Sequence, residues 1–310
     1  MTTNPTITEN GKLALHSVSI DTAMQAVEQV MFDVVNSEIE ILRDASRHIL
    51  SAGGKRVRPR LLMLSFLASG GKLIEKALQA AAALELVHTA SVVHDDINDH
   101  GVMRRGRPSV NAVWGRTFAL LTGDFLFTKV YELMAPYKDL NELFAEATIA
   151  LVEGETLQAS AVKENNLTSE VYLRIIGLKT AILFKIGAIM GAKLAHTTHE
   201  VETAMGEYGY NIGLAFQIVD DILDLTSDEE KLGKTAGLDV NQGKGFASVH
   251  GDDPMESVKK KMLEGDRIVK ARIQARHLVE SALTSLDVLP DSEHKDELIA
   301  LGQYIIDREF

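Results

Sequence analysis

The chain has 310 residues and a mass of 33.9 kDa, with 44 acidic and 32 basic residues that give a formal net charge of −12. This acidic balance argues against a protein that binds nucleic acid through its overall charge, so we expect no nucleic-acid partner. The absence of cysteine excludes disulfide bridges, zinc–thiolate and iron–sulfur centres and thiol nucleophiles, and it suits a cytoplasmic protein.

Hydrophobic spacing predicts helices along nearly the whole chain. Apolar residues recur at helical intervals, whereas the alternation typical of strands is almost absent. The low content of proline, 6 residues, and of aromatic side chains, 5%, agrees with helix. The predicted helices cover residues 20–50, 56–69, 73–99, 112–135, 140–163, 168–195, 199–226, 254–286 and 293–308. We therefore expect an all-α fold in which residues 1–310 form a single domain, one large helical bundle.

No segment has the pattern of a targeting signal or a membrane span. The first twenty residues show neither a basic run followed by an apolar core nor an Arg-rich composition, so we expect no leader peptide. The most apolar stretches, residues 77–93 and 180–195, are interrupted by charged side chains, so we expect no transmembrane helix. Residues 259–261 and 267–276 are basic and are predicted to form a solvated amphipathic helix with at most transient membrane contact.

Two segments with the pattern Asp-Asp-x-x-Asp stand at the ends of apolar runs. The first set follows the run 80–93, and the second follows the run 212–219. The six carboxylates belong to Asp95, Asp96, Asp99, Asp220, Asp221 and Asp224. Helices this apolar are normally buried, and buried carboxylates are costly unless a cation lies between them.

Helical spacing brings two carboxylates of each set onto one face. Side chains four apart point the same way, so Asp95 and Asp99 share a face while Asp96 is turned by about 100°. Paired oxygen ligands, without cysteine or a His-x-x-x-His pattern, point to a hard cation such as magnesium, which keeps water and phosphate oxygens as its remaining ligands. For either set alone, the alternative is an exposed acidic helix end.

A magnesium–carboxylate site calls for a phosphate ligand, and basic residues near loop glycines provide candidates to bind it. Residues 53–59 form a short basic turn before a predicted helix, where N–H groups and cationic side chains together bind phosphate. Further basic residues lie after the first aspartate set, at the start of the apolar segment near residue 180, and in the Gly-rich stretch 233–251. These are Arg104, Arg105, Lys179, Lys234 and Lys244. Any one of them alone could be a surface base that keeps the protein soluble.

In these residues the chain resembles the trans-prenyltransferases, the polyprenyl diphosphate synthase family that includes farnesyl and geranylgeranyl diphosphate synthases. The similarity covers about residues 50–250, and its motifs occur in the family's order. It rests on Gly53–Pro59, His88, Asp95–Asp99, Arg104–Gly106, Gly123-Asp124, Lys179-Thr180, Phe216-Gln217, Asp220–Asp224, Lys234 and Lys244. The resemblance implies an isoprenoid synthase fold with a deep central cavity, two aspartate motifs facing each other across its mouth, and a homodimer.

The resemblance also implies an activity, head-to-tail elongation. A prenyltransferase of this kind condenses isopentenyl diphosphate with an allylic prenyl diphosphate, and three magnesium ions bridge its aspartates to the allylic diphosphate. In this sequence the implied metal ligands are Asp95, Asp99 and Asp220. The remaining aspartates, Asp96, Asp221 and Asp224, count among the implied catalytic residues.

The basic and polar residues divide between two implied diphosphate sites. The residues that resemble the pocket for isopentenyl diphosphate are Lys55, Arg58, His88 and Arg105. Those that resemble contacts to the allylic diphosphate are Arg104, Lys179, Gln217 and Lys234, with Thr180 and Lys244 as further candidates. Without the family, His88 on its apolar helix would be interpreted as a core histidine.

The implied reaction needs no nucleophile from the protein. Bound cations neutralise the charge that grows on the diphosphate as its C–O bond breaks. The allylic cation must then be kept from water and held against the double bond of the second substrate, which is a matter of positioning. The departed diphosphate is expected to take the proton that is lost, so no protein base is assigned.

Product length is predicted from the helix that carries the first aspartate set. Ala90 and Ser91 precede Asp95 by five and four residues, which places them about 6 to 7.5 Å deeper along the helix. Both are small, whereas short-chain relatives commonly carry a bulky aromatic residue there. We therefore predict an all-trans product of geranylgeranyl length or longer. The alternative is a cavity floor formed by side chains of another helix.

Three other functions fit parts of the pattern. A class I terpene cyclase shares the expected fold, but its second metal motif usually mixes Asn, Ser and Glu. A His-Asp phosphohydrolase would need further histidines at ligand spacing. A regulatory partner subunit tends to lose the aspartates, whereas this chain keeps all six. We therefore favour elongation.

Overall fold

The structure is a computed structural model that describes residues 19–166, 168–236 and 266–308. Its α-helices in chain order are α1 (Ile20–Val34), α2 (Glu40–Ser51), α3 (Val57–Ala68), α4 (Ile74–Asn98), α5 (Val110–Met134), α6 (Lys138–Lys163), α7 (Ser169–Ile176), α8 (Ile182–Leu194), α9 (His199–Ala236), α11 (Asp266–Ser285) and α12 (Glu293–Asp307). A π-helical turn, η1 (Gly177–Ala181), joins α7 to α8, and a 3₁₀ turn, η2 (Leu286–Val288), follows α11. The expected all-α fold is confirmed.

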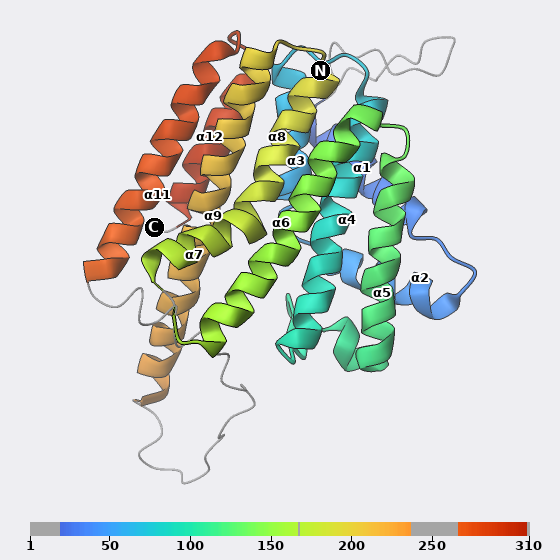
Figure 1. Ribbon diagram of the computed structural model, residues 1–310, viewed down its shortest axis with the longest axis vertical. Coiled ribbons are helices and arrows are strands. Elements are labelled where there is room, and N and C mark those ends of the chain that lie inside the picture. Colours follow the sequence, from blue (N-terminus) through green and yellow to red (C-terminus); the bar gives the residue numbers. More distant parts are fainter. Residues whose placement is uncertain (1–18, 167, 237–265, 309–310) are drawn as a thin grey trace, which may run out of the picture.

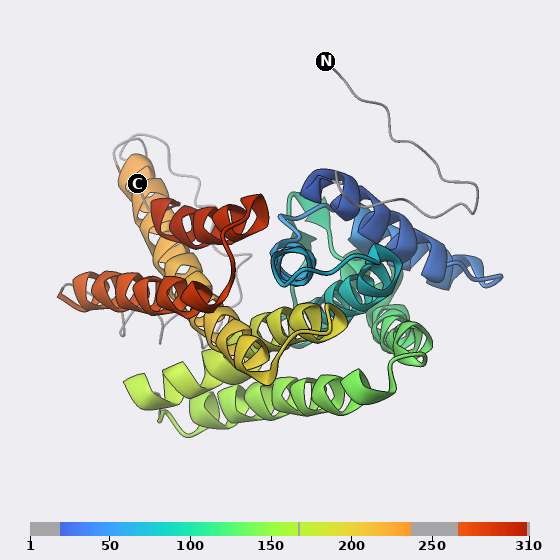
Figure 2. The ribbon, with the colours of Figure 1, turned by 90° about the horizontal axis from the view of Figure 1, so that it is seen from above.

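The long helices lie side by side along the molecule (Figure 1). α4 packs along α5, α8 packs along both α3 and α9, and α11 packs along α9. Seen from above, α3, α4 and α8 lie in the middle, with α1 and α2 on one side and α11 and α12 on the other (Figure 2). The middle helices are enclosed on nearly all faces, which is why the run Leu61–Leu64 in α3 is fully buried.

A glycine lets two of these middle helices approach closely. A side chain at Gly191 of α8 would lie 2.4 Å from the carbonyl oxygen of Leu62 and 2.8 Å from the amide nitrogen of Phe66. Both atoms belong to the α3 backbone, which cannot move aside as the end of a flexible side chain could. The absence of a Cβ therefore sets the spacing between α3 and α8, and with it the place of the basic turn before α3.

The predicted helix over residues 20–50 is wrong, because the structure has two helices there. α1 ends at Val34, and α2 begins at Glu40. Between them, the Ser37 hydroxyl accepts a hydrogen bond from the Ile39 amide at 3.1 Å. Short polar side chains of this kind compete with the helical hydrogen bonds of the backbone, so they break a helix that apolar spacing alone would continue.

A two-stranded hairpin follows α4 where only a turn was expected. β1 (Met103–Arg104) pairs antiparallel with β2 (Arg107–Pro108). Arg105 and Gly106 form the tip with φ of +50° and +74°, the arrangement of the tight turn that matches the twist of a hairpin. This hairpin returns the chain to α5 and holds Arg104 beside the end of α4.

The other predicted helices agree with the structure to within a few residues where it describes them, with two differences. The predicted helix 168–195 contains the π-helical turn, and the helix predicted to end at residue 226 continues to Ala236. The start predicted at residue 254 lies outside the described residues. The stretch Ser169–Leu194 is long and apolar enough to cross a membrane by composition, but 72% of its most apolar window is buried among the other helices, as expected for a core segment.

Candidate active site

A cavity of about 320 Å³ brings much of the predicted site together. The predicted residues that line it are Arg58, His88, Ser91, Asp95, Asp99, Arg104, Lys179, Thr180, Gln217 and Asp221. They come from α3, α4, the hairpin, η1 and α9, so segments distant in sequence meet here. The rest of the lining includes polar residues of α6 and α7, namely Glu155, Gln158 and Tyr172, and an apolar wall of Val92, Leu151, Ile175 and Ile176.

The first aspartate set splits into two roles. Asp95 and Asp99 line the cavity one helical turn apart, as their spacing predicts. Asp96 is only 2% exposed, and its Oδ1 accepts hydrogen bonds from Nε and Nη2 of Arg104 at 3.0 and 2.5 Å. Asp96 therefore fixes Arg104 at the edge of the cavity, while its two neighbours face the cavity itself.

Carboxylates are crowded around Asp95. Burial raises the pKa of Asp95 to about 7, because it disfavours the charged form, and Lys179 offsets part of this rise. A hydrogen bond to Glu155 and the charge of Asp99 raise this pKa as well. Lys179 itself lies 2.5 Å from Glu155 Oε1 and donates to Gln158 Oε1 at 2.9 Å. A further cation here would stabilise the charged form of Asp95.

The turn that carries Lys179 and Thr180 is π-helical. The Ile182 amide donates to the carbonyl oxygen of Gly177, five residues earlier, which makes the turn wider than an α-helical one. Here both Lys179 and Thr180 line the cavity.

A chain of hydrogen bonds connects the π-helical turn to the second aspartate set. Thr180 Oγ1 donates to Gln217 Oε1 at 2.8 Å, and Gln217 Nε2 donates to Asp221 Oδ1 at 3.0 Å. The other oxygen of Asp221 accepts from the Tyr172 hydroxyl at 2.6 Å, and Asp221 is 1% exposed. Burial and the charge of Asp221 raise the pKa of Tyr172 well above its ordinary value, so Tyr172 remains a donor. This series of hydrogen bonds therefore fixes the orientation of the Gln217 amide and the Thr180 hydroxyl.

The structure does not bring the rest of the second aspartate set into the cavity lining. Asp220 is half-buried, and its Oδ1 lies 2.5 Å from Nη2 of Arg308, just after α12. Burial raises the pKa of Asp220, although the neighbouring guanidinium group lowers it. Asp224 is exposed. For Lys234 only the backbone position is described, and Lys244 lies outside the described residues.

Arg58 and His88 form the cationic side of the cavity. The Arg58 guanidinium lies 5.0 Å from the ring centre of Phe184, and its buried Nε has no hydrogen-bond partner. Burial lowers the pKa of His88 well below its ordinary value, and the charges of Arg58 and Arg105 lower it further. His88 is thus held neutral, and an anion entering the cavity would find an unpartnered N–H of Arg58.

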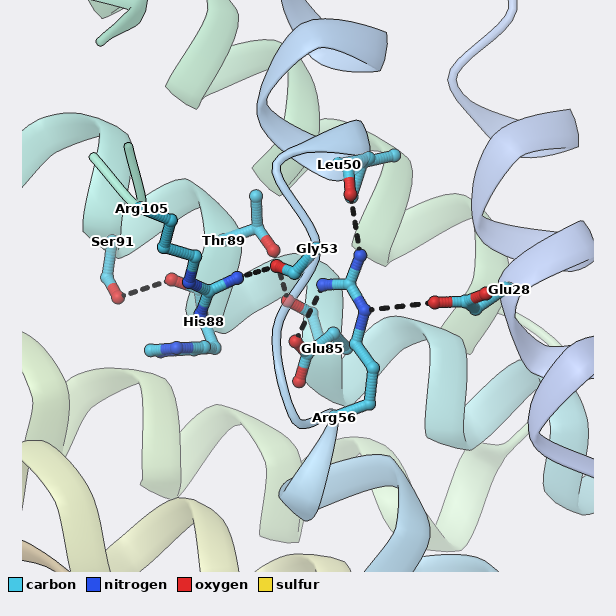
Figure 3. Close-up of polar contacts among 9 residues, drawn as sticks. All are labelled: Glu28, Leu50, Gly53, Arg56, Glu85, His88, Thr89, Ser91 and Arg105. Carbon is cyan, nitrogen blue, oxygen red and sulfur yellow. Dashed lines mark hydrogen bonds and ion pairs between the residues drawn. The ribbon is translucent and has the colours of Figure 1, made fainter. Parts of the chain in front are cut away.

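Two predicted ligands of the same pocket lie outside its lining. Lys55 Nζ lies 5.3 Å from the ring centre of Tyr304 on α12. Arg105 is exposed and donates a hydrogen bond to the carbonyl oxygen of Gly53, so that it lies across the basic turn (Figure 3). Both predictions followed from the family resemblance, which does not fix the direction of a long, flexible side chain.

The predicted chain-length residues are separated in the same way. Ser91 lines the cavity and its hydroxyl donates to the carbonyl oxygen of His88 at 2.8 Å. Ala90 is fully buried but does not line the cavity, so the structure does not support it as the floor. The apolar wall comes instead from Val92 and from Leu151, Ile175 and Ile176 on α6 and α7.

The donors present fit a hard divalent cation. In the described part of the chain, no three histidine, aspartate or glutamate side chains converge on a preformed metal centre. Magnesium usually takes one or two carboxylates from a protein and completes its shell with water and substrate phosphate. Asp95 and Asp99 offer such a pair, and a bound cation would offset the burial that raises the pKa of Asp95.

The cavity also contains polar residues that the sequence reasoning missed. Glu155 and Gln158 hold Lys179, and their spacing of three on a predicted helix was the available signal. Tyr172 gave no signal, because its partner Asp221 lies 49 residues away. Arg308 gave none either, because nothing in its local sequence relates it to Asp220.

Comparison with known proteins gives a consistent result. Residues 39–272 match the polyprenyl synthetase family. Octaprenyl diphosphate synthase of Escherichia coli K12 is 33% identical, and the match covers 92% of this chain and 96% of that protein. Geranylgeranyl diphosphate synthase of Methanosarcina mazei is 34% identical, and the match covers 87% of this chain and 91% of that protein. The crystal structure of heptaprenyl diphosphate synthase from Staphylococcus aureus superimposes with a TM-score of 0.82 at 30% identity, over 94% of this chain and 99% of that one.

The neutral state of His88 predicts a loss of stability in acid. Because its pKa in the folded protein lies well below the value of about 6.5 in an unfolded chain, the unfolded chain binds an extra proton below pH 6.5. Between pH 7.5 and 5.5 this lowers the free energy of unfolding by about 1.4 kcal/mol, and His88→Gln should remove that part of the pH dependence. Urea unfolding at both pH values measures the difference. The control is His277→Gln on the surface of α11, and equal pH dependence in the wild type and His88→Gln would contradict a neutral His88.

Proposed function

This chain belongs to the polyprenyl synthetase family and is a trans-prenyltransferase, and from this premise we propose that its cavity condenses isopentenyl diphosphate with an allylic prenyl diphosphate. The observation that supports the proposal most directly is the division of one cavity into three parts. Carboxylates gather around Asp95, an unpartnered guanidinium group lies at Arg58, and an apolar wall includes Leu151. These parts suit a metal-bound diphosphate, a second diphosphate and a prenyl chain.

The two diphosphates are assigned to opposite sides of the cavity. Arg58 and the neutral His88 would bind isopentenyl diphosphate, because the Arg58 Nε–H lacks a partner that an anion can supply. Lys179, Arg104 and Thr180 lie beside the carboxylates and would contact the allylic diphosphate. Each cation there already has an anionic partner, Glu155 or Asp96, which sets its position before substrate arrives.

We propose that three magnesium ions act here, held by Asp95 and Asp99 and by Asp220. When bound, they supply the positive charge that stabilises the departing diphosphate. Asp220 would exchange its ion pair with Arg308 for this role. The support for magnesium is the all-oxygen donor set and the raised pKa values of Asp95 and Asp220, both of which burial raises.

The remaining task of the chain is to position the substrates and exclude water. Val92, Ile175 and Ile176 offer the prenyl group an apolar surface on which a carbocation meets no nucleophile. Asp221 and Thr180 hold the Gln217 amide in a fixed orientation, so its second N–H can contact the allylic diphosphate without first reorganising, whereas Thr180 would first turn its hydroxyl hydrogen away from Gln217. The departed diphosphate, rather than a side chain, would take the proton.

Elongation should depend on magnesium and on the first aspartate pair. Incubated with magnesium, isopentenyl diphosphate and an allylic primer, the protein should release prenyl diphosphates longer than the primer, and Asp99→Asn should slow release about a hundredfold or more. Asp287→Asn, an exposed aspartate in η2, is the control. Sizing the products by chromatography measures the effect. No elongation with any primer, while calorimetry still detects metal binding, would contradict the proposal and favour a regulatory subunit.

The product is proposed to be of geranylgeranyl length or longer, with a floor set by α6 and α7. Leu151 contributes to the apolar wall, and the small Ser91 leaves the α4 side open. Leu151→Phe should therefore shorten the main product by at least about one isoprene unit, because added volume in a packed site is poorly absorbed. Leu140→Phe, at a buried leucine of α6 outside this cavity, is the control. A product spectrum unchanged in Leu151→Phe would show that the floor lies elsewhere.

We also propose that two copies of the chain associate through α5 and α6. Large apolar side chains on these helices are exposed, among them Tyr131 at 76%, Ile149 at 59% and Val152 at 64%. They surround an apolar groove of about 720 Å³ between the two helices. Exposed patches of this kind usually mark an interface, and the family resemblance implies a homodimer.

Dimerisation is tested by placing a charge in this surface. The wild type should sediment at about twice the mass of one chain, and Ile149→Glu should shift it toward the mass of a single chain, because an unpaired charge is costly to bury in an interface. Val269→Glu on α11, at a side chain of similar exposure, is the control. A single-chain mass for the wild type at micromolar concentration would contradict the proposal. The single domain over residues 1–310 and the cytoplasmic location stay predictions.

A further inference from the structure

Arg56 stands between two residues assigned to the isopentenyl diphosphate pocket, but it points away from that pocket. It precedes the first residue of α3, with Lys55 before it and Arg58 two positions after it. Its backbone is left-handed, with φ of +47°, a conformation that is strained for a residue with a side chain. Its side chain is buried, 8% exposed. Something must hold this residue in place against the strain.

All three guanidinium nitrogens of Arg56 bind partners, each on a different helix (Figure 3). Nη1 donates to Glu85 Oε1 on α4 at 2.9 Å, and Nη2 donates to the carbonyl oxygen of Leu50 in the last turn of α2 at 2.7 Å. Nε donates to Glu28 Oε1 on α1 at 3.3 Å. The side chain of Arg56 thus connects the start of α3 to three other helices.

Glu85 is the buried partner of this ion pair and interrupts the apolar run of α4. It is 3% exposed, and its Oε2 has no hydrogen-bond partner. Its charge raises the pKa values of Arg58 and Arg105, which burial lowers. The buried carboxylate of Glu85 therefore stabilises the charged forms of several guanidinium groups. One of them, that of Arg58, faces the cavity. His88, also a cavity residue, lies one turn after Glu85 on the same helix.

The basic turn is held on its outer side as well. Arg105 from the hairpin donates to the carbonyl oxygen of Gly53 (Figure 3). Gly54 allows this approach, because a Cβ there would lie 2.3 Å from a guanidinium nitrogen of Arg105. The turn therefore lies between Arg105 on one side and the Arg56–Glu85 pair on the other.

We propose that Arg56 and Glu85 are positioning residues for the isopentenyl diphosphate site, an inference that rests on the proposed function. They touch no substrate. Their ion pair sets the backbone of residues 53–56, which fixes where α3 begins and so where the Arg58 guanidinium enters the cavity. Lysine cannot replace Arg56, because a single ammonium group lacks the planar fork that reaches three partners at fixed angles.

The alternative is a purely structural role, in which the pair stabilises the protein without affecting the site. A buried ion pair contributes little net stability by itself, although removing one partner leaves a costly unpaired charge. A structural role predicts lower stability with unchanged substrate affinities in whatever protein remains folded. A positioning role predicts an effect confined to one of the two substrates, because Arg58 lies on α3, whereas the residues assigned to the allylic diphosphate lie on the hairpin, η1 and α9.

The test compares Arg56→Met and Glu85→Gln with a matched control. The control is Arg60→Met, which removes another ion pair between α3 and α1, the exposed contact of Arg60 with Asp21 at 3.0 Å. In steady-state kinetics, both test variants should raise the KM for isopentenyl diphosphate about tenfold and leave that for the allylic substrate within about twofold. Binding of inorganic pyrophosphate without metal, measured by calorimetry, should weaken in parallel. Arg60→Met should change neither quantity.

A double variant covers the case in which the single variants do not fold. Arg56→Met/Glu85→Met removes both charges, so it should recover thermal stability but keep the raised KM for isopentenyl diphosphate. Unchanged KM values in folded variants, or equal changes for both substrates, would overturn the inference. Failure of the wild type to elongate any primer would instead overturn the proposed function, so the two failures are distinguishable.

Discussion

Charged groups inside an all-helical core are the constraint on which the rest of this structure depends. Three carboxylates are paired with an opposite charge from another element: Asp96 with Arg104, Asp220 with Arg308, and Glu85 with Arg56. Such pairs add little net stability, so their presence calls for another explanation. They join segments that local sequence does not connect, and they fix the directions of long side chains that would otherwise sample many rotamers. The cavity is therefore arranged before any ligand binds.

The same pairing explains how an acidic protein can accept anionic ligands. The net charge of −12 opposes an incoming diphosphate, but the cations in and around the cavity come in groups around Arg58 and Lys179. Where carboxylates outnumber cations, around Asp95, a metal ion would supply the difference. A ligand thus replaces contacts that already exist and does not bring a new charge into an apolar interior. The free-energy cost of burying these charged side chains is already offset by their partners in the folded protein.

The sequence predicted the helices and most of the cavity, and it failed where tertiary contacts decide. Periodic apolar spacing located most helices, and the spacing of Asp95 and Asp99 placed them correctly on one face. In the loop after Val34 the Ser37 hydroxyl accepts from the Ile39 amide, a local side-chain contact that periodicity does not register. Tyr172 and Arg308 contact partners that lie 49 and 88 residues away in the sequence. Whether Ala90 faces the cavity depends on how the other helices pack around α4. No pattern in a single sequence encodes these contacts.

The π-helical turn has a consequence for how the gene can vary. It holds one more residue than an α-helical turn, and deleting that residue would rotate all of α8 by about 100° relative to α7. Gly191 would then leave its contact with α3, and Phe184 would leave Arg58. The number of codons between Tyr172 and Gly191 is therefore fixed, whereas the loop between α1 and α2, which lines neither site nor core helix, can gain or lose residues freely. Length variation among descendants of this gene should avoid the first segment and accumulate in the second.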